Sequence, residues 1–143
     1  MRTTSSDPIA VWMGLMGLVM DHKLLAQGLL QEASGMPWSR YRALRRVEDR
    51  GWSQRELAEA MRVDASAMSG IVDDLVERGY AERVTHPQDA RMKLVTITES
   101  GRDLMEHLRT LPGVVPPPVA TLTHAERREL ARLVDKMRAA AEA

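Results

Sequence analysis

The 143-residue sequence contains no cysteine and no phenylalanine, and its 20 Lys and Arg residues are balanced by 20 Asp and Glu residues. Without cysteine there are no disulfide bonds and no thiolate chemistry, which suits a reducing compartment. Without phenylalanine, ten methionines and the aliphatic residues must fill the interior, which predicts adaptable packing. A net charge of zero means that any contact with nucleic acid must come from local clusters.

Motifs of enzymes and metal sites are also missing. The four histidines, His22, His86, His107 and His124, have no metal-ligand spacing. There is no glycine-rich phosphate loop, nucleophile elbow or paired-carboxylate motif. We therefore expect neither enzyme activity nor a cofactor. A structural zinc ion held by His107 and acidic residues of the first helix stays open as an alternative.

Only one long apolar run is present, from Ile9 to Met20, and Asp21-His22-Lys23 closes it. Twelve residues are too few to cross the hydrocarbon core of a bilayer as a helix. No small-residue cleavage site follows the run, as a signal peptide would require. We expect no membrane span, no membrane partner and a cytoplasmic location.

The central stretch predicts a helix-turn-helix. Ser53-Gln54-Arg55-Glu56 has the pattern of a capping box, which starts a helix at about Gln54. This helix is expected to end at Met61 and to bury Leu57, Ala58 and Met61. Arg62-Val63-Asp64 is short and ends in a good N-cap residue, so a second helix follows directly and ends at Gly79.

The second helix has one apolar face and one small, polar face. Its apolar stripe has the spacing of a 3.6-residue period and consists of Met68, Ile71, Val72, Leu75 and Val76. The opposite face carries Ser66, Ser69, Gly70, Asp73 and Glu77, with Ala67 and Asp74 at its margin. At its N-terminal end the residues are small and let a partner approach closely. By itself this pattern suits an ordinary packed helix equally well.

The segment that follows favours a winged helix. Residues 81–85 and 92–98 are β-prone, and we expect residues 86–91 to form a protruding loop with Arg91 near its tip. A helix-turn-helix followed by such a hairpin usually places its second helix in the DNA major groove and a wing arginine in the minor groove. The alternative for Arg91 is a salt bridge with Asp89.

Helices are predicted on both sides of this region. Asp7-Pro8 is expected to open a helix to about Gln31, and a second helix is expected from about Pro37 to Arg50. After the wing, Thr98 caps a helix to about Leu111, and the proline-rich residues 112–118 predict an extended connector. Thr123-His124-Ala125-Glu126 opens the last helix. The first helix is apolar on nearly all sides near its N-terminus, which predicts that it packs against another chain.

Charge is distributed unevenly along the chain. Residues 38–50 contain five arginines and two acidic residues, a net charge of +3, which fits either a solvated face or a contact with phosphate or an anionic ligand. Residues 52–93 contain six basic and eight acidic residues, a net charge of −2. This acidic balance predicts modest DNA affinity that falls steeply with salt.

The order SQRELAEAM, VDASAMSGIVDDLVERGYAERV and DARMKLVTITESG resembles the MarR family of ligand-responsive transcription regulators. The family's wing pattern is met by Asp89, Arg91, Ile97, Thr98 and Gly101. One departure is that Gly70 or Asp74 stands where relatives often have an arginine. The resemblance implies a mainly α fold with a small β wing, in which residues 37–98 form a winged helix-turn-helix within a single domain of residues 1–143. Residues 9–36 and 99–143 would be dimerisation helices.

The resemblance also implies a homodimer that binds a pseudo-palindromic DNA operator, acts as a repressor in a bacterial cytoplasm and responds to a small aromatic or lipophilic effector. Alternatives are a winged helix for protein contact only and a metal-responsive regulator. The candidate phosphate contacts are Ser53, Gln54, Arg55, Arg83 and Lys93. The candidate base-reading residues are Ser66, Ala67, Ser69, Gly70 and Asp73, whose carboxylate could accept a hydrogen bond from a cytosine amino group. The wing residues Asp89 and Arg91 complete the candidate DNA-binding set. The candidate effector-binding residues are Trp12, Met13, Met16, Met20, His22, Trp38 and Arg42.

Overall fold

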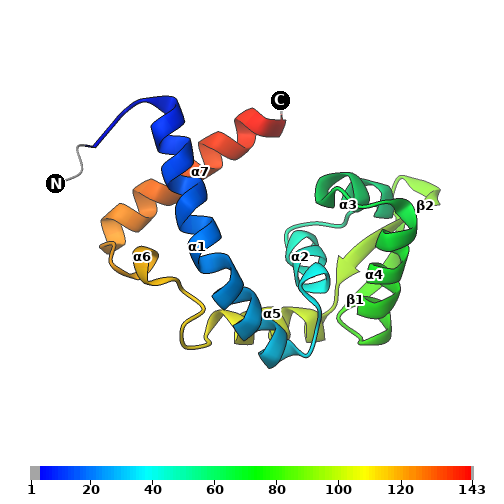
Figure 1. The fold of residues 1–143 in the computed structure, drawn as a ribbon. Coiled ribbons are helices and arrows are strands. Elements are labelled where there is room, and N and C mark those ends of the chain that lie inside the picture. Colours follow the sequence, from blue (N-terminus) through cyan, green and yellow to red (C-terminus); the bar gives the residue numbers. More distant parts are fainter. Residues whose placement is uncertain (1–3, 143) are drawn as a thin grey trace. The chain divides into compact units, whose positions relative to one another are not determined.

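The structure is a computed structural model that describes residues 4–142, and these form seven helices and a two-stranded antiparallel sheet (Figure 1). The elements are α1 (Pro8–Ser34), α2 (Trp38–Val47), α3 (Gln54–Met61), α4 (Ala65–Glu77), β1 (Ala81–His86), β2 (Asp89–Ile97), α5 (Glu99–Arg109), α6 (Pro117–Ala120) and α7 (His124–Glu142). The chain divides into two compact units, which are described separately: residues up to 26 with those from 115, and residues 27–114. The predicted fold class is confirmed.

Local capping fixes the ends of α3 and α4 as the sequence predicts. The Glu56 amide donates to Ser53 Oγ at 3.1 Å, and the Ser53 amide donates to Glu56 Oε2 at 2.8 Å, which completes the capping box. The turn reverses at Arg62, whose φ of 55° is left-handed. Asp64 then caps α4 by accepting from the Ala67 amide at 2.7 Å. The two helices of the motif therefore begin where their capping residues require.

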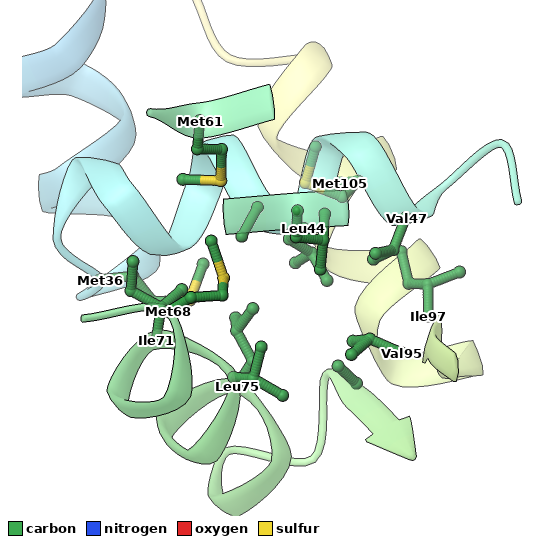
Figure 2. Packing of buried hydrophobic residues seen from close by; sticks show 14 of the residues in the cluster. Met36, Leu44, Val47, Met61, Met68, Ile71, Leu75, Val95, Ile97 and Met105 are labelled. Carbon is green, nitrogen blue, oxygen red and sulfur yellow. The ribbon is translucent and has the colours of Figure 1, made fainter. Parts of the chain in front are cut away.

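The core of residues 27–114 lies beneath the helix-turn-helix (Figure 2). Of the predicted stripe on α4, Met68, Ile71, Val72 and Leu75 are buried, while Val76 is half-buried. They belong to the same cluster as residues from α2, α3, β2 and α5: Leu44, Val47, Leu57, Val95, Met105 and Leu108. Burial of one stripe fixes which face of α4 remains exposed.

The wing differs from its prediction. Strand β2 begins at Asp89, so only Pro87 and Gln88 form the turn, and the expected loop of residues 86–91 is too long. The pairing shifts between Thr85, opposite Lys93, and His86, opposite Asp89. This irregularity leaves Ala90 to Met92 without register partners. Arg91 therefore lies in the irregular part of β2 and not at the tip.

Three other boundaries are corrected. Helix α1 continues past Gln31 to Ser34, and α2 ends at Val47 and not at Arg50. The α2 end is fixed because Trp52 Nε1 donates to the Arg46 carbonyl oxygen at 2.9 Å. The proline-rich connector contains a short helix, α6, because prolines are compatible with a first helical turn, which needs no amide donors.

The unit formed by the start of α1 with α6 and α7 has no buried side chain among its described residues. Its exposed apolar residues include Trp12, Val19, Met20, Leu24 and Leu25. Because α1 continues beyond Asp21-His22-Lys23, it contains an 18-residue window of mean hydropathy 1.4, long and apolar enough by length and composition alone to cross a membrane. The same surface suits an apolar interface between proteins.

Candidate nucleic-acid interface

The N-terminal half of α4 presents a face of small side chains. Ser66, Ala67 and Gly70 are exposed, and Ser69 is half-buried. No side chain larger than a serine hydroxymethyl group stands among these four residues, because the large apolar residues of α4 all point into the core. A backbone or a base edge can therefore approach this face closely. The structure brings all four candidate reading residues together here.

Arg83 contacts both Asp73 and Gln54, so each of these three candidate residues has a partner within the protein. Arg83 Nη2, on β1, lies 2.6 Å from Asp73 Oδ1 on α4 and 3.3 Å from Gln54 Oε1 at the start of α3. The sequence suggested Asp73 for accepting a hydrogen bond from a base, and Arg83 and Gln54 for contacting phosphate. In this structure the Asp73 charge is instead neutralised by Arg83.

The start of α3 places a largely exposed arginine, Arg55, next to Gln54. The Arg55 side chain is 89% exposed and has an ion-pair contact of 3.3 Å with Glu59, which is 70% exposed. Such an exposed pair is worth little and is easily exchanged for a phosphate contact. The Ser53 hydroxyl is already used in the capping box, where it accepts a hydrogen bond from the Glu56 amide. Its O–H donor and its second lone pair remain available for a further hydrogen bond.

The wing presents a second largely exposed arginine, Arg91. The Arg91 side chain is 95% exposed, and its Nε lies 3.5 Å from Asp89 Oδ1, so the predicted alternative of an ion pair does form. Asp89 Oδ1 also accepts from the Arg91 amide at 3.0 Å. An ion pair so exposed competes poorly with a phosphate-lined groove. Lys93 Nζ donates across the hairpin to Thr85 Oγ1 at 2.9 Å, which directs it along the wing.

Three of the five arginines in residues 38–50 contact neighbouring groups of the protein, although the Arg50 side chain is still 52% exposed. Arg46 Nη2 donates to the Ala60 carbonyl oxygen at 3.4 Å, and the Arg50 guanidinium lies 3.7 Å from the Trp52 ring centroid. Arg40 pairs with Asp74. Among residues 4–142, Arg42 and Arg45 make no ion pair within 4.0 Å. Of the helix-two arginines, these two remain the candidates for an anionic ligand.

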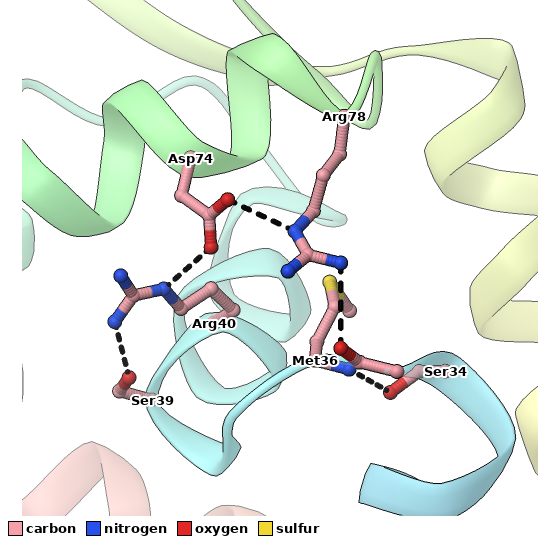
Figure 3. Close-up of polar contacts among 7 residues, drawn as sticks. Ser34, Met36, Ser39, Arg40, Asp74 and Arg78 are labelled. Carbon is pink, nitrogen blue, oxygen red and sulfur yellow. Dashed lines mark hydrogen bonds and ion pairs between the residues drawn. The ribbon is translucent and has the colours of Figure 1, made fainter.

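Sequence reasoning missed the role of Asp74, which it placed at the margin of the exposed face. Asp74 Oδ2 accepts from Arg40 Nε at 2.8 Å, and Asp74 Oδ1 accepts from Arg78 Nε at 2.9 Å (Figure 3). The hydrogen bond from Arg40, followed by that from Arg78, lowers the pKa of Asp74 below its ordinary value, although partial burial opposes the change. The spacing of four residues between Asp74 and Arg78 was a readable signal; the partner on α2 was not.

The candidate effector residues are divided between the two units. Trp12, Met13, Met16 and Met20 are exposed on α1, with His22 half-buried on the same helix. Trp38 and Arg42 are half-buried on α2, where Trp38 stacks on Tyr41 with ring centroids 5.0 Å apart. Within the part of the chain that the structure describes, no group of three His, Asp or Glu side chains is arranged to hold a metal ion.

The arrangement of α3, the turn, α4 and the β1–β2 hairpin defines a winged helix-turn-helix protein. A protein-family model with the description "MarR family" matches residues 34–92 of the sequence. The HTH-type transcriptional regulator BilQ of Clostridium symbiosum is 34% identical over 88 residues, 61% of this chain and 61% of BilQ. The aligned segment thus spans about three fifths of the length of this relative.

Solved structures extend the likeness over nearly the whole chain. The transcriptional regulator BldR from Sulfolobus solfataricus has a TM-score of 0.70 at 19% identity and covers 96% of this chain and 99% of its own. A mutant MarR from E. coli complexed with operator DNA has a TM-score of 0.58 at 26% identity, with 92% and 99% covered. Residues 34–92 thus match the MarR family that the wing motif and helix-turn-helix resemble, and the similarity of fold continues beyond them.

Proposed function

We propose that this chain is a DNA-binding transcriptional regulator and not an enzyme, acting as a homodimer on a pseudo-palindromic operator in a bacterial cytoplasm, most simply as a repressor. The observation that carries the proposal is the small, exposed face of Ser66, Ala67, Ser69 and Gly70 on a capped helix whose opposite face is buried. This is the form of a helix that enters the major groove. Arg55 and Arg91 are exposed cations suited to phosphate and to the minor groove.

The exposed apolar side chains of α1 and α7 support the homodimer. Trp12 on α1 is 62% exposed, and Leu133 and Met137 on α7 are 40% and 46% exposed. Because α1 and α7 bury no side chain within residues 4–26 and 115–141, a second copy is the simplest cover for these apolar side chains. A two-fold dimer would place two α4 helices in successive major grooves, with half-site centres about 10 bp apart.

The DNA proposal is tested by selecting bound sequences from a random duplex pool and then titrating the selected duplex against salt. We expect a two-fold symmetric site, and we expect Arg91→Ala to reduce affinity and to lower the slope of log affinity against log salt by about 1. The matched control is Arg132→Ala, which removes an exposed guanidinium from α7, where Arg132 pairs with Glu129. If no salt-dependent binding to any duplex is found, the proposal fails. The chain would then be a module for protein contacts, a role that the net negative charge of residues 52–93 would suit.

An effector belongs to the same proposal. The exposed Met and Trp side chains of α1 have the chemistry to hold an aromatic or lipophilic molecule. In the other unit, Trp38 and Arg42 of α2 have the chemistry to hold an aromatic ring and an acidic group. Such a ligand would lower operator affinity by favouring a dimer whose α4 helices are wrongly spaced. The test is a panel of aromatic acids and phenols added to the protein bound to its selected duplex. A panel in which no compound changes the affinity contradicts this part of the proposal.

A further inference from the structure

Asp74 links the end of α4 to α2 and to the α1–α2 junction, two neighbouring segments that lie more than 30 residues earlier in the sequence (Figure 3). It lies in the last turns of α4, and its two carboxylate oxygens are occupied by two different arginines, Arg40 of α2 and Arg78 just beyond α4. Arg78 Nη1 also donates to the Gly35 carbonyl oxygen at 3.4 Å, beside the end of α1. One carboxylate therefore connects α4, α2 and the α1–α2 junction.

The contacts of this cluster are more sheltered than the other ion pairs on α4. The side chains of Arg40 and Asp74 are 26% and 25% exposed, whereas Asp73, in the neighbouring pair, is 65% exposed. The α1–α2 junction is itself closely bonded: Ser34 Oγ donates to the Leu30 carbonyl oxygen at 2.6 Å and accepts from the Met36 amide at 3.2 Å. Met36 beside it is 2% exposed. A sheltered pair with two partners holds a defined geometry better than an exposed one.

We infer that Asp74 is a positioning residue for the DNA-reading helix: it touches no base, but it holds α4 at a fixed rotation and height against α2 and the α1–α2 junction. This inference rests on the proposed DNA-binding function. It predicts that removing the Asp74 charge weakens binding to the operator, whereas simple electrostatics predicts stronger binding. Removing a negative charge from a DNA-binding unit strengthens its attraction to phosphate. Loosening the reading helix weakens only the contacts that depend on its placement.

The test compares Asp74→Asn with Glu77→Gln. Both substitutions remove one negative charge from α4, but Glu77 is exposed and makes no ion pair within 4.0 Å among the described residues. Affinities are measured for the selected duplex and for a scrambled duplex, at a temperature where circular dichroism shows each variant folded. We expect Asp74→Asn to weaken selected-duplex binding about tenfold and to leave scrambled-duplex binding equal or stronger. Glu77→Gln should preserve the ratio of the two affinities, and Asp74→Glu should restore part of it.

A purely structural role predicts that Asp74→Asn lowers stability while the folded protein keeps the wild-type ratio of affinities. That result, or an equal change in Glu77→Gln, overturns the inference. If the wild-type protein binds no duplex, the proposed function fails, and amide hydrogen exchange decides the positioning role separately. Faster exchange in residues 34–40 and 74–79 of Asp74→Asn, relative to Glu77→Gln, supports it. Unchanged exchange in both segments overturns it.

Discussion

Two helical glycines with opposite surroundings allow a matched test of the fold and of the site. A Cβ added at Gly70, on the exposed face of α4, meets nothing within 4 Å. A Cβ added at Gly101, in the first turn of α5, overlaps the Tyr80 carbonyl oxygen and lies 2.7 Å from Ile97 Cγ1. The substitutions Gly70→Ala and Gly101→Ala add the same methyl group to the same kind of element. Their expected effects differ in sign.

Replacing a helical glycine by alanine stabilises the folded state by about 0.5–1 kcal/mol when the methyl group has room. Gly70→Ala should gain this amount. At Gly101 the obstacle is backbone that cannot easily move, because the Tyr80 oxygen accepts from the Thr98 amide at 3.0 Å. Overpacking of this kind costs about 1–3 kcal/mol. The net expectation for Gly101→Ala is a loss of about 1 kcal/mol, the difference between the middles of these two ranges.

The measurement is denaturant unfolding of both variants and of wild type at one protein concentration, because dimerisation would make stability depend on concentration. Binding of the selected duplex is measured on the same samples. If α4 reads DNA, Gly70→Ala should bind more weakly while it unfolds at higher denaturant, since its methyl group stands on the reading face. A Gly101→Ala protein as stable as wild type would refute the packing described here. A Gly70→Ala protein with undiminished affinity would refute close approach at that residue.

Three further outcomes follow from caps and core. Ser53→Ala should lower the free energy of unfolding by about 1 kcal/mol, measured by denaturant titration, because the Glu56 amide loses its acceptor. The hydrogen bond from the Ser53 amide lowers the pKa of Glu56 from its ordinary 4.5. The ionised Glu56 carboxylate therefore stabilises the folded state above pH 4.5, and this stabilisation is lost as the pH falls through the folded-state pKa. Glu56→Gln should flatten that part of the profile of unfolding free energy against pH, measured by denaturant titration. Leu44→Ala, at a fully buried position, should cost about 2–5 kcal/mol in thermal and denaturant unfolding.

Local signals predicted the reading helices well. Ser53, Asp64 and Gly79 fixed the ends of α3 and α4 because caps and left-handed turns act over three or four residues. The wing was less predictable, since residues 86–91 contain a proline and several turn formers, yet both strands extend to a two-residue turn with a shift in pairing just before it. Strand register depends on cross-strand contacts that a sequence pattern does not contain. For this reason Arg91 was expected in the loop of the wing but lies in the irregular part of β2, while its exposure agrees with the expectation.

Charge was the hardest property to predict, because a count along the chain differs from a count in space. Residues 52–93 have a net charge of −2 in the sequence, and this balance argued for weak DNA binding. In the folded unit, Arg40 from outside this window neutralises Asp74, and Arg83 neutralises Asp73. Arg50, also from outside, lies 3.6 Å from Glu56. Since two of these acidic groups are paired with arginines from outside the window, the linear sum understates the positive charge of the folded unit, where Arg55 and Arg91 remain largely exposed beside Glu59 and Asp89.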